Sequence, residues 1–328
     1  SRATRTADGG ASSETARSAS SAATLVVRRA GMLTTVQDAG RTGHRRQGVP
    51  VSGAADRFAL RLANLLVGND CAAAGLEFTW GGPEIAFSDG AWVAVAGGDF
   101  GVPRGRPFWV EAGETLRFSS ARSGCRGYLA VAGGLQVPRV LGSRSTYSRA
   151  GLGGLEGRAL RDGDRVPVAR IERRVQGRWW MDPRILPRYD APAVLRVTLG
   201  AHAAEFAPDW TKQQFKVSPQ SDRMGVRLSG SAVARQRGGE LTSMPVAPGT
   251  VQVPPDGHPI VLLADAQTIG GYPQLAHVVA VDLPVAAQLR PGEAVTFEVV
   301  TLEAAHQLWQ ARERAWGVLR EGVGQKLA

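Results

Sequence analysis

The 328-residue chain contains few of the residues that build common catalytic centres: two cysteines, five histidines and three lysines. Cys71 and Cys125 form no Cys-x-x-Cys pair, and the histidines are isolated from each other and from the cysteines. This spacing predicts no metal site. We interpret the cysteines as small buried side chains of a protein in the reducing cytoplasm, with a disulfide between them left open. No apolar run approaches the ~18 residues of a membrane span.

The short motifs of nucleotide-dependent and serine-based catalysis are missing as well. The sequence has no GxxxxGK[ST] loop, no Gly-rich dinucleotide turn between a strand and a helix, and no GxSxG elbow. The three lysines, at 212, 216 and 326, do not lie in a Met-Lys-Met context that would carry attached biotin. We therefore predict that this chain itself binds no cofactor, and that any ATP or biotin is used by partner subunits.

Positive charge is the strongest compositional bias. The formal net charge is +10, and only three of the 39 basic residues are lysines. The arginines are scattered and no aromatic side chains are interleaved with them, which argues against a nucleic-acid surface. A basic surface instead favours an acidic partner or an anionic substrate.

Apolar patterning predicts a mainly β protein in two halves with a few short helices. Residues 1–23 have almost no large apolar side chain, so we expect a disordered tail there. Short alternating runs separated by Gly, Pro and Asp turns are typical of barrels or sandwiches. They fill 24–170 and recur in 191–301, with a basic, proline-containing linker at 171–190 and a C-terminal helix and tail at 302–328.

Two segments have helical periodicity. Residues 54–67 place Phe58, Leu62 and Leu65 on one face, with Ser52 as the expected N-cap and Gly68 as the stop. Residues 302–320 carry a second apolar stripe, which we interpret as core packing.

Polar side chains gather in Gly-rich loops, where the backbone follows paths that other residues resist. The largest loop lies within Gly31–Pro83, and four others occupy 142–146, 221–225, 252–257 and 265–273. Taken singly, each is more typical of an ordinary turn than of a site, because Asp, Ser, Thr and Gly are common turn residues. Five such loops in one chain favour a polar binding cleft.

Long ordered blocks of the sequence resemble one known family. These are TVQDAGRTGHRRQGVPVSGAADRFALRLANLLVGN, LEFTWGGPEIAF, YLAVAGGLQVPRVLGSRST, SDRMGVRLSG and GTVQVPPDGHPIVLLADAQTIGGYPQLAHV. The chain is similar to the allophanate hydrolase subunit 2 family, which includes the 5-oxoprolinase C subunits, the Kip antagonist and the carboxyltransferase part of urea carboxylase. The resemblance implies two cyclophilin-like β-barrel domains and a heteromer with a subunit 1 partner.

The resemblance implies an enzyme subunit that is inactive alone. The first expectation is the C subunit of an ATP-dependent 5-oxoprolinase, which opens 5-oxoproline to glutamate with subunit 1 (Kip inhibitor or 5-oxoprolinase B type) and an ATP-dependent third subunit. For the cleft we predict catalytic Asp265, Gln267 and Tyr272. Predicted substrate-binding residues are Gln37, Asp38, Arg41, Ser145, Arg223, Gln252 and Thr268. Arginines would clamp a carboxylate, Gln and Tyr would polarise an amide, and Asp would handle protons.

Three alternatives stay open at this point, and the weakest is a generic β-barrel protein that binds small polar ligands. The chain could act as a carboxyltransferase component that moves a carboxyl group from carboxybiotin to urea or a related amide. It could instead be a regulatory protein of the Kip antagonist type that acts by binding its partner. Neither the substrate nor the stoichiometry follows from the sequence.

Overall fold

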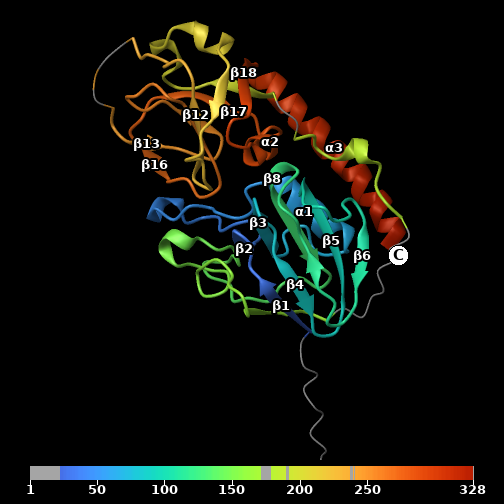
Figure 1. Ribbon diagram of the computed structural model, residues 1–328. Coiled ribbons are helices and arrows are strands. Elements are labelled where there is room, and N and C mark those ends of the chain that lie inside the picture. The colour runs from blue at the N-terminus through green and yellow to red at the C-terminus, as the bar shows by residue number, and fades with distance from the viewer. Residues whose placement is uncertain (1–22, 171–178, 190–191, 237–238, 240, 328) are drawn as a thin grey trace, which may run out of the picture.

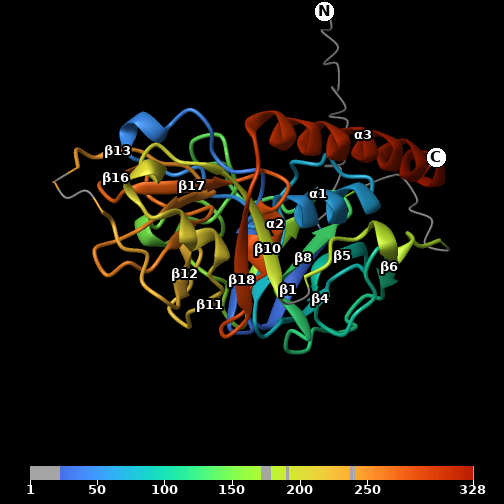
Figure 2. The same cartoon turned by 90° about the horizontal axis from the view of Figure 1, so that it is seen from above.

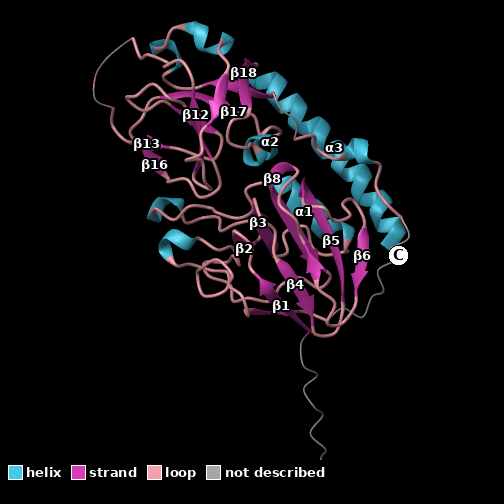
Figure 3. Ribbon diagram, viewed as in Figure 1, coloured by secondary structure: helices cyan, strands magenta, loops and turns pink. Residues whose placement is uncertain are grey.

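The structure is a computed structural model, which describes residues 23–170, 179–189, 192–236, 239 and 241–327. Apart from Ala23, the expected tail at 1–23 lies outside the described residues, and so do 171–178 and 190 of the expected linker. Two β-rich parts lie side by side, and one long helix runs along both of them (Figure 1). Strands dominate both parts, as predicted (Figure 3).

The first part contains two antiparallel sheets that enclose one apolar core. The five-stranded sheet has the order β2 (Leu33–Gln37), β3 (Gly75–Thr79), β8 (Ser123–Val131), β5 (Ala91–Asp99) and β6 (Pro107–Val110). The four-stranded sheet has the order β7 (Leu116–Arg117), β4 (Glu84–Phe87), β1 (Ala23–Arg29) and β9 (Arg165–Val168).

The second part is a closed seven-stranded barrel, as the family resemblance implied. Its order is β10 (Ala193–Leu199), β17 (Gln274–Val278), β14 (Thr250–Gln252), β15 (Ile260–Leu262), β12 (Gly225–Ser229), β11 (Phe215–Val217) and β18 (Ala294–Val299), which pairs in parallel with β10. A separate ribbon pairs β13 (Met244–Pro245) with β16 (Ile269–Gly270). The hydrogen-bond ladders described for the first part, by contrast, do not close into one ring.

Helix α1 (Arg57–Leu66) packs on the outer face of β5 and β8. That face carries small residues such as Ala94 and Ala130, whereas alternate positions of the same strands place Val93 and Leu129 in the sheet core. Small side chains let the helix approach the sheet closely, and the amphipathic pattern of α1 buries its apolar face there.

The start of α1 corrects the expected N-cap. The helix begins at Arg57, and Asp56 is the N-cap, whose side chain accepts a hydrogen bond from the Ala59 amide (2.9 Å). Ser52 instead has a left-handed backbone (φ 55°) and donates its hydroxyl to Asp265 in the barrel part. A contact with a distant residue therefore overrides a good local capping signal.

The remaining helices are α2 (Leu283–Gln288) and α3 (Leu302–Leu327). Helix α3 extends seven residues beyond the predicted end at Arg320 because Val323 and Leu327 are buried against the α1 cluster. Seen from above, α3 lies across the two parts beside α1 (Figure 2). Short 3₁₀ turns occupy Arg45–Gln47, Ser148–Ala150, Pro183–Ile185, Ala203–Glu205 and Pro208–Lys212.

Candidate functional site

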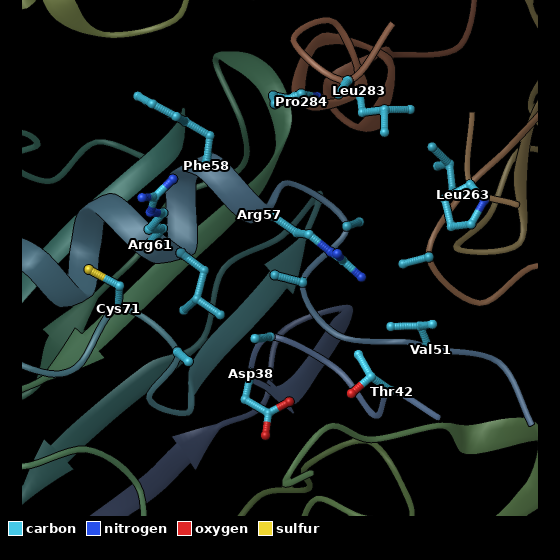
Figure 4. A pocket seen from close by; sticks show the side chains of 18 of the residues that line it. Asp38, Thr42, Val51, Arg57, Phe58, Arg61, Cys71, Leu263, Leu283 and Pro284 are labelled. Atoms are coloured by element: carbon cyan, nitrogen blue, oxygen red, sulfur yellow. The ribbon is translucent and has the colours of Figure 1, made fainter. Parts of the chain in front are cut away.

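A cavity of about 740 Å³ opens where the first part, the barrel and α3 meet. Its size falls in the range of pockets that hold small organic ligands, ~300–1,000 Å³. The apolar wall comes mainly from the loop before α1, from α1 itself, from the loop after β15 and from the start of α2: Val51, Ala54, Ala55, Phe58, Leu60, Leu263, Leu283 and Pro284 (Figure 4). We call this cavity, with the residues lining it, the cleft.

Charged side chains line the rest of the cleft, and arginines outnumber acids. They are Arg45, Arg57, Arg61, Arg312, Asp38, Asp70 and Glu313. Arg61 pairs with Glu313 (2.9 Å) and lies 4.0 Å from the centroid of the Trp316 ring, which fixes α3 to α1. The cleft therefore keeps an excess of positive charge after this pair is discounted.

Asp38 is the one predicted site residue that lines the cleft. Its carboxylate follows β2 directly and accepts hydrogen bonds from the hydroxyls of Ser143 (2.6 Å) and Ser145 and from the amides of Gly40 (2.8 Å) and Arg144 (2.6 Å). Burial alone would raise the pKa of Asp38, but these hydrogen bonds outweigh burial and lower it below the ordinary 3.8. Asp38 is thus ionised at neutral pH and anchors the loops around it.

Gln37, Arg41 and Ser145 surround this anchor but are fully buried beneath the cleft. Gln37 donates to Thr35 (3.0 Å) and to the carbonyl of Thr146 (3.1 Å). Arg41 donates a hydrogen bond from Nη2 to the Ser145 carbonyl, and its Nε and Nη1 find no acceptor among the described residues. These three predicted residues hold two loops of the first part together.

Arg223 and Asp265 join the two parts through a buried ion network. Arg223 donates from Nε to Asp265 (2.8 Å), from Nη2 to Asp265 (3.1 Å) and to the Gly53 carbonyl (2.7 Å), and from Nη1 to Glu77. Ser52 also donates to Asp265. The loop before α1 contacts Arg223 and Asp265 through Ser52 and Gly53, as predicted. These groups nevertheless use their hydrogen-bonding capacity on each other.

The network continues from Glu77 into the first part. Tyr128 donates its hydroxyl to Glu77 (2.9 Å), and the same hydroxyl accepts from the Asp56 amide (2.8 Å). Asp56 accepts from Gln288 (2.9 Å) of α2 and from Tyr189 (2.8 Å). Burial raises the pKa of Asp56 above its ordinary value, and the Gln288 hydrogen bond offsets part of that rise.

Four predicted residues lie around the β13–β16 ribbon, away from the cleft lining. Gln267 donates to Gln252 (3.3 Å), and Gln252 donates to the Tyr272 carbonyl (3.3 Å). Thr268 is buried, whereas the Tyr272 side chain is 46% exposed. The ten predicted residues thus form three neighbouring clusters, and a catalytic role for Asp265, Gln267 and Tyr272 stays a prediction.

The residue that sequence reasoning missed is Arg57. It is the first residue of α1 and extends into the open centre of the cleft (Figure 4). The sequence carried only a weak signal, because a positive charge in the first turn of a helix opposes the helix dipole by about 0.3–1 kcal/mol.

Neither a metal site nor a membrane span emerges from the described residues. Within 23–170, 179–189 and the described residues from 192 to 327, no three His, Cys, Asp or Glu side chains converge as metal ligands. No helix in this part of the chain is both long and apolar enough to cross a bilayer.

The two free cysteines offer a chemical probe of the cleft. Cys71 is half-buried on the cleft wall and Cys125 is fully buried, and burial raises the pKa of both thiols. Since the thiolate is the reactive form, we expect slow modification of Cys71 by Ellman's reagent, accelerating at alkaline pH, and modification of Cys125 only on unfolding. A Cys71→Ser variant should show no native-state reaction; rapid labelling of that variant would contradict the arrangement.

These observations define a class of protein. The chain belongs to the family described as "Carboxyltransferase domain, subdomain A and B", whose pattern matches residues 47–299. That range contains Arg57, the Glu77–Arg223–Asp265 network and the whole barrel.

Individual relatives narrow the class. The 5-oxoprolinase C subunit of Escherichia coli (strain K12) is 41% identical over 304 residues, which cover 88% of this chain and 96% of that protein. The corresponding C subunit of Haemophilus influenzae is 36% identical, with coverage of 89% and 96%. A crystal structure of the K. lactis urea amidolyase superimposes with a TM-score of 0.84 at 29% identity, covering 90% of this chain and 20% of that chain. The chain therefore belongs with the 5-oxoprolinase C subunits and corresponds to about a fifth of the urea amidolyase.

Proposed function

We propose that this chain is the C subunit of a 5-oxoprolinase and opens 5-oxoproline to glutamate together with partner subunits. One observation carries the proposal: the 41% identity to the Escherichia coli C subunit extends over 96% of that protein. The match therefore spans almost the whole length of that C subunit. The cleft supplies a compatible site, with an apolar wall for a ring and an excess of arginine for an anion.

In this proposal the need for ATP follows from the chemistry, and subunit 1 follows from the family resemblance. Opening a stable lactam with ATP requires a nucleotide site, and we propose that a third, ATP-dependent subunit provides it. Subunit 1, of the Kip inhibitor or 5-oxoprolinase B type, would form the heteromer with this chain. We place the complex in the cytoplasm, where ATP is available, and assign no bound cofactor to this chain.

A second candidate is a carboxyltransferase component that transfers a carboxyl group from carboxybiotin to urea or a related amide. The specific observation in its favour is the family match together with the close superposition on the urea amidolyase. For this candidate the biotin carrier would be another chain, and the substrate urea is neutral.

Reconstitution separates the two candidates. The chain is co-purified with its subunit 1 partner and the ATP-dependent subunit, and glutamate formation is measured with 5-oxoproline and ATP. We expect 5-oxoproline-dependent ATP hydrolysis that needs all three chains, with omission of each chain as the control. A complete complex without glutamate formation would refute the proposal, and biotin-dependent carboxylation of urea would establish the second candidate.

A further inference from the structure

Arg57 differs from the other arginines of the cleft because its guanidinium has no partner among the described residues. Across the described residues its guanidinium makes no hydrogen bond and no ion pair, and the residue is the first of α1. Arg61 is paired with Glu313. Arg45 and Arg312 each donate to a backbone carbonyl, of Val246 and Val281. Arg57 alone among these four presents all its donors to the cleft.

The acids that line the cleft are engaged elsewhere. Asp38 is saturated by four donors, and Glu313 is paired with Arg61. Asp70 turns one carboxylate oxygen to the Ala72 amide (2.7 Å). No acid of the described cleft lining is therefore paired with Arg57.

Electrostatics distinguish Arg57 in the same way. The side chain is exposed to solvent through the cleft, yet the protein around it removes part of its water and lowers its pKa. Burial also lowers the pKa of Arg41 and Arg312, but nearby acids counteract the effect there. At Arg57 desolvation is the only cause. A partly desolvated cation without a counter-charge gains from an external anion, because the anion restores the interactions that water no longer supplies.

We infer that Arg57 is the carboxylate anchor of the cleft and selects a small ligand that carries one carboxylate beside an apolar body. A guanidinium with free donors matches a carboxylate bidentately. Val51, Leu263 and Leu283 surround it and offer the apolar contact (Figure 4). The inference rests on the proposed function and deepens it, because 5-oxoproline is an anion at neutral pH whereas urea is not.

The test compares 5-oxoproline with its neutral carboxamide. Binding to the wild-type chain, within its purified complex, is measured by calorimetry, and Cys71 labelling reports occupancy of the cleft independently. We expect the acid to bind more tightly than the amide. Arg57→Gln should weaken binding of the acid about 10- to 100-fold and leave the amide unchanged. Arg57→Lys should recover part of the preference. In steady state the loss should appear in KM more than in kcat.

The control is Arg28→Gln, which removes the same charge from an exposed position of β1 outside the cleft lining. Its binding should equal that of the wild type, and both variants should unfold at the wild-type temperature. Unchanged acid binding in Arg57→Gln, absence of binding to any variant, or a loss confined to partner association would each overturn the inference. If the preference for the acid depends on Arg57 but the complex forms no glutamate, the role of Arg57 as carboxylate anchor is supported and the proposed opening of 5-oxoproline is refuted.

Discussion

Replacement of Arg223 by methionine is expected to destabilise the protein by about 3–5 kcal/mol, the cost of stranding buried charges. Arg223 is the donor that connects Glu77, Asp265 and the Gly53 carbonyl, and both carboxylates are nearly inaccessible to water. Methionine fills similar space but leaves Asp265 without its cation and Glu77 with only Arg126, whose Nε lies 4.0 Å away. Urea unfolding followed by circular dichroism measures the loss, with the slope of the transition checked against the wild type.

Two variants calibrate this result. Arg117→Met removes an exposed partner of Glu84, so its cost should stay within about 1 kcal/mol. Arg223→Lys keeps the positive charge but replaces the planar guanidinium, which reaches three acceptors, by a compact ammonium group. The loss of unfolding free energy should therefore lie between those of the other two variants. If Arg223→Met unfolded within about 1 kcal/mol of the wild type, the ion network would not hold the two parts together.

Asp38→Asn is expected to cost about 2–4 kcal/mol, because an amide group would face four donors that now share one carboxylate. The same urea unfolding measurement gives this loss. The control is Asp99→Asn, whose carboxylate accepts from the Gly101 amide at a more exposed turn and should cost less than about 1 kcal/mol. Equal losses of unfolding free energy in the two variants would mean that the four donors give Asp38 no special contribution to stability.

The same substitution should change the response to acid. The folded-state pKa of Asp38 lies below its ordinary 3.8, so its ionised form stabilises the fold at neutral pH. That contribution is complete above the unfolded-state pKa and is lost as the pH falls through the folded-state pKa. The difference in unfolding free energy between wild type and Asp38→Asn should therefore shrink below about pH 4. A difference that stays constant down to about pH 2 would show that the fold does not lower the pKa of Asp38.

Sequence patterning was enough to predict the strand-rich halves and the two long helices, because alternation and 3.6-residue periodicity are local signals. It could not distinguish the two sheets of the first part from a closed ring, since closure depends on strand tilt and stagger between distant strands. The sequence also named Arg223 and Asp265 as cleft residues without revealing that they bind each other, because a contact between residues 42 positions apart is not a local signal. Ser52 was assigned to the wrong role because its partner lies 213 residues away.

The charged residues of the sequence did not reveal which arginine is free to bind a ligand. The sequence singled out arginines beside glycine and aspartate, and the structure places Arg41 and Arg223 in buried networks. Arg57 had no polar neighbour pattern beyond Asp56 and was overlooked. What distinguishes a ligand-binding arginine is the lack of an internal partner, and that property belongs to the folded chain alone.

Helix α3 gives the cleft a mechanical property. Trp309, Arg312 and Glu313 of this helix line the cleft, while Trp316 is buried against α1 and Arg312 holds the Val281 carbonyl of the barrel part. Helix α3, with 26 residues and a length of about 39 Å, thus holds the two parts in a fixed relative position. Hinge opening would have to break these contacts together, so the cleft exists before any ligand arrives. A ligand then binds to a preorganised cleft, and its affinity is determined by how well it replaces the water inside the cleft.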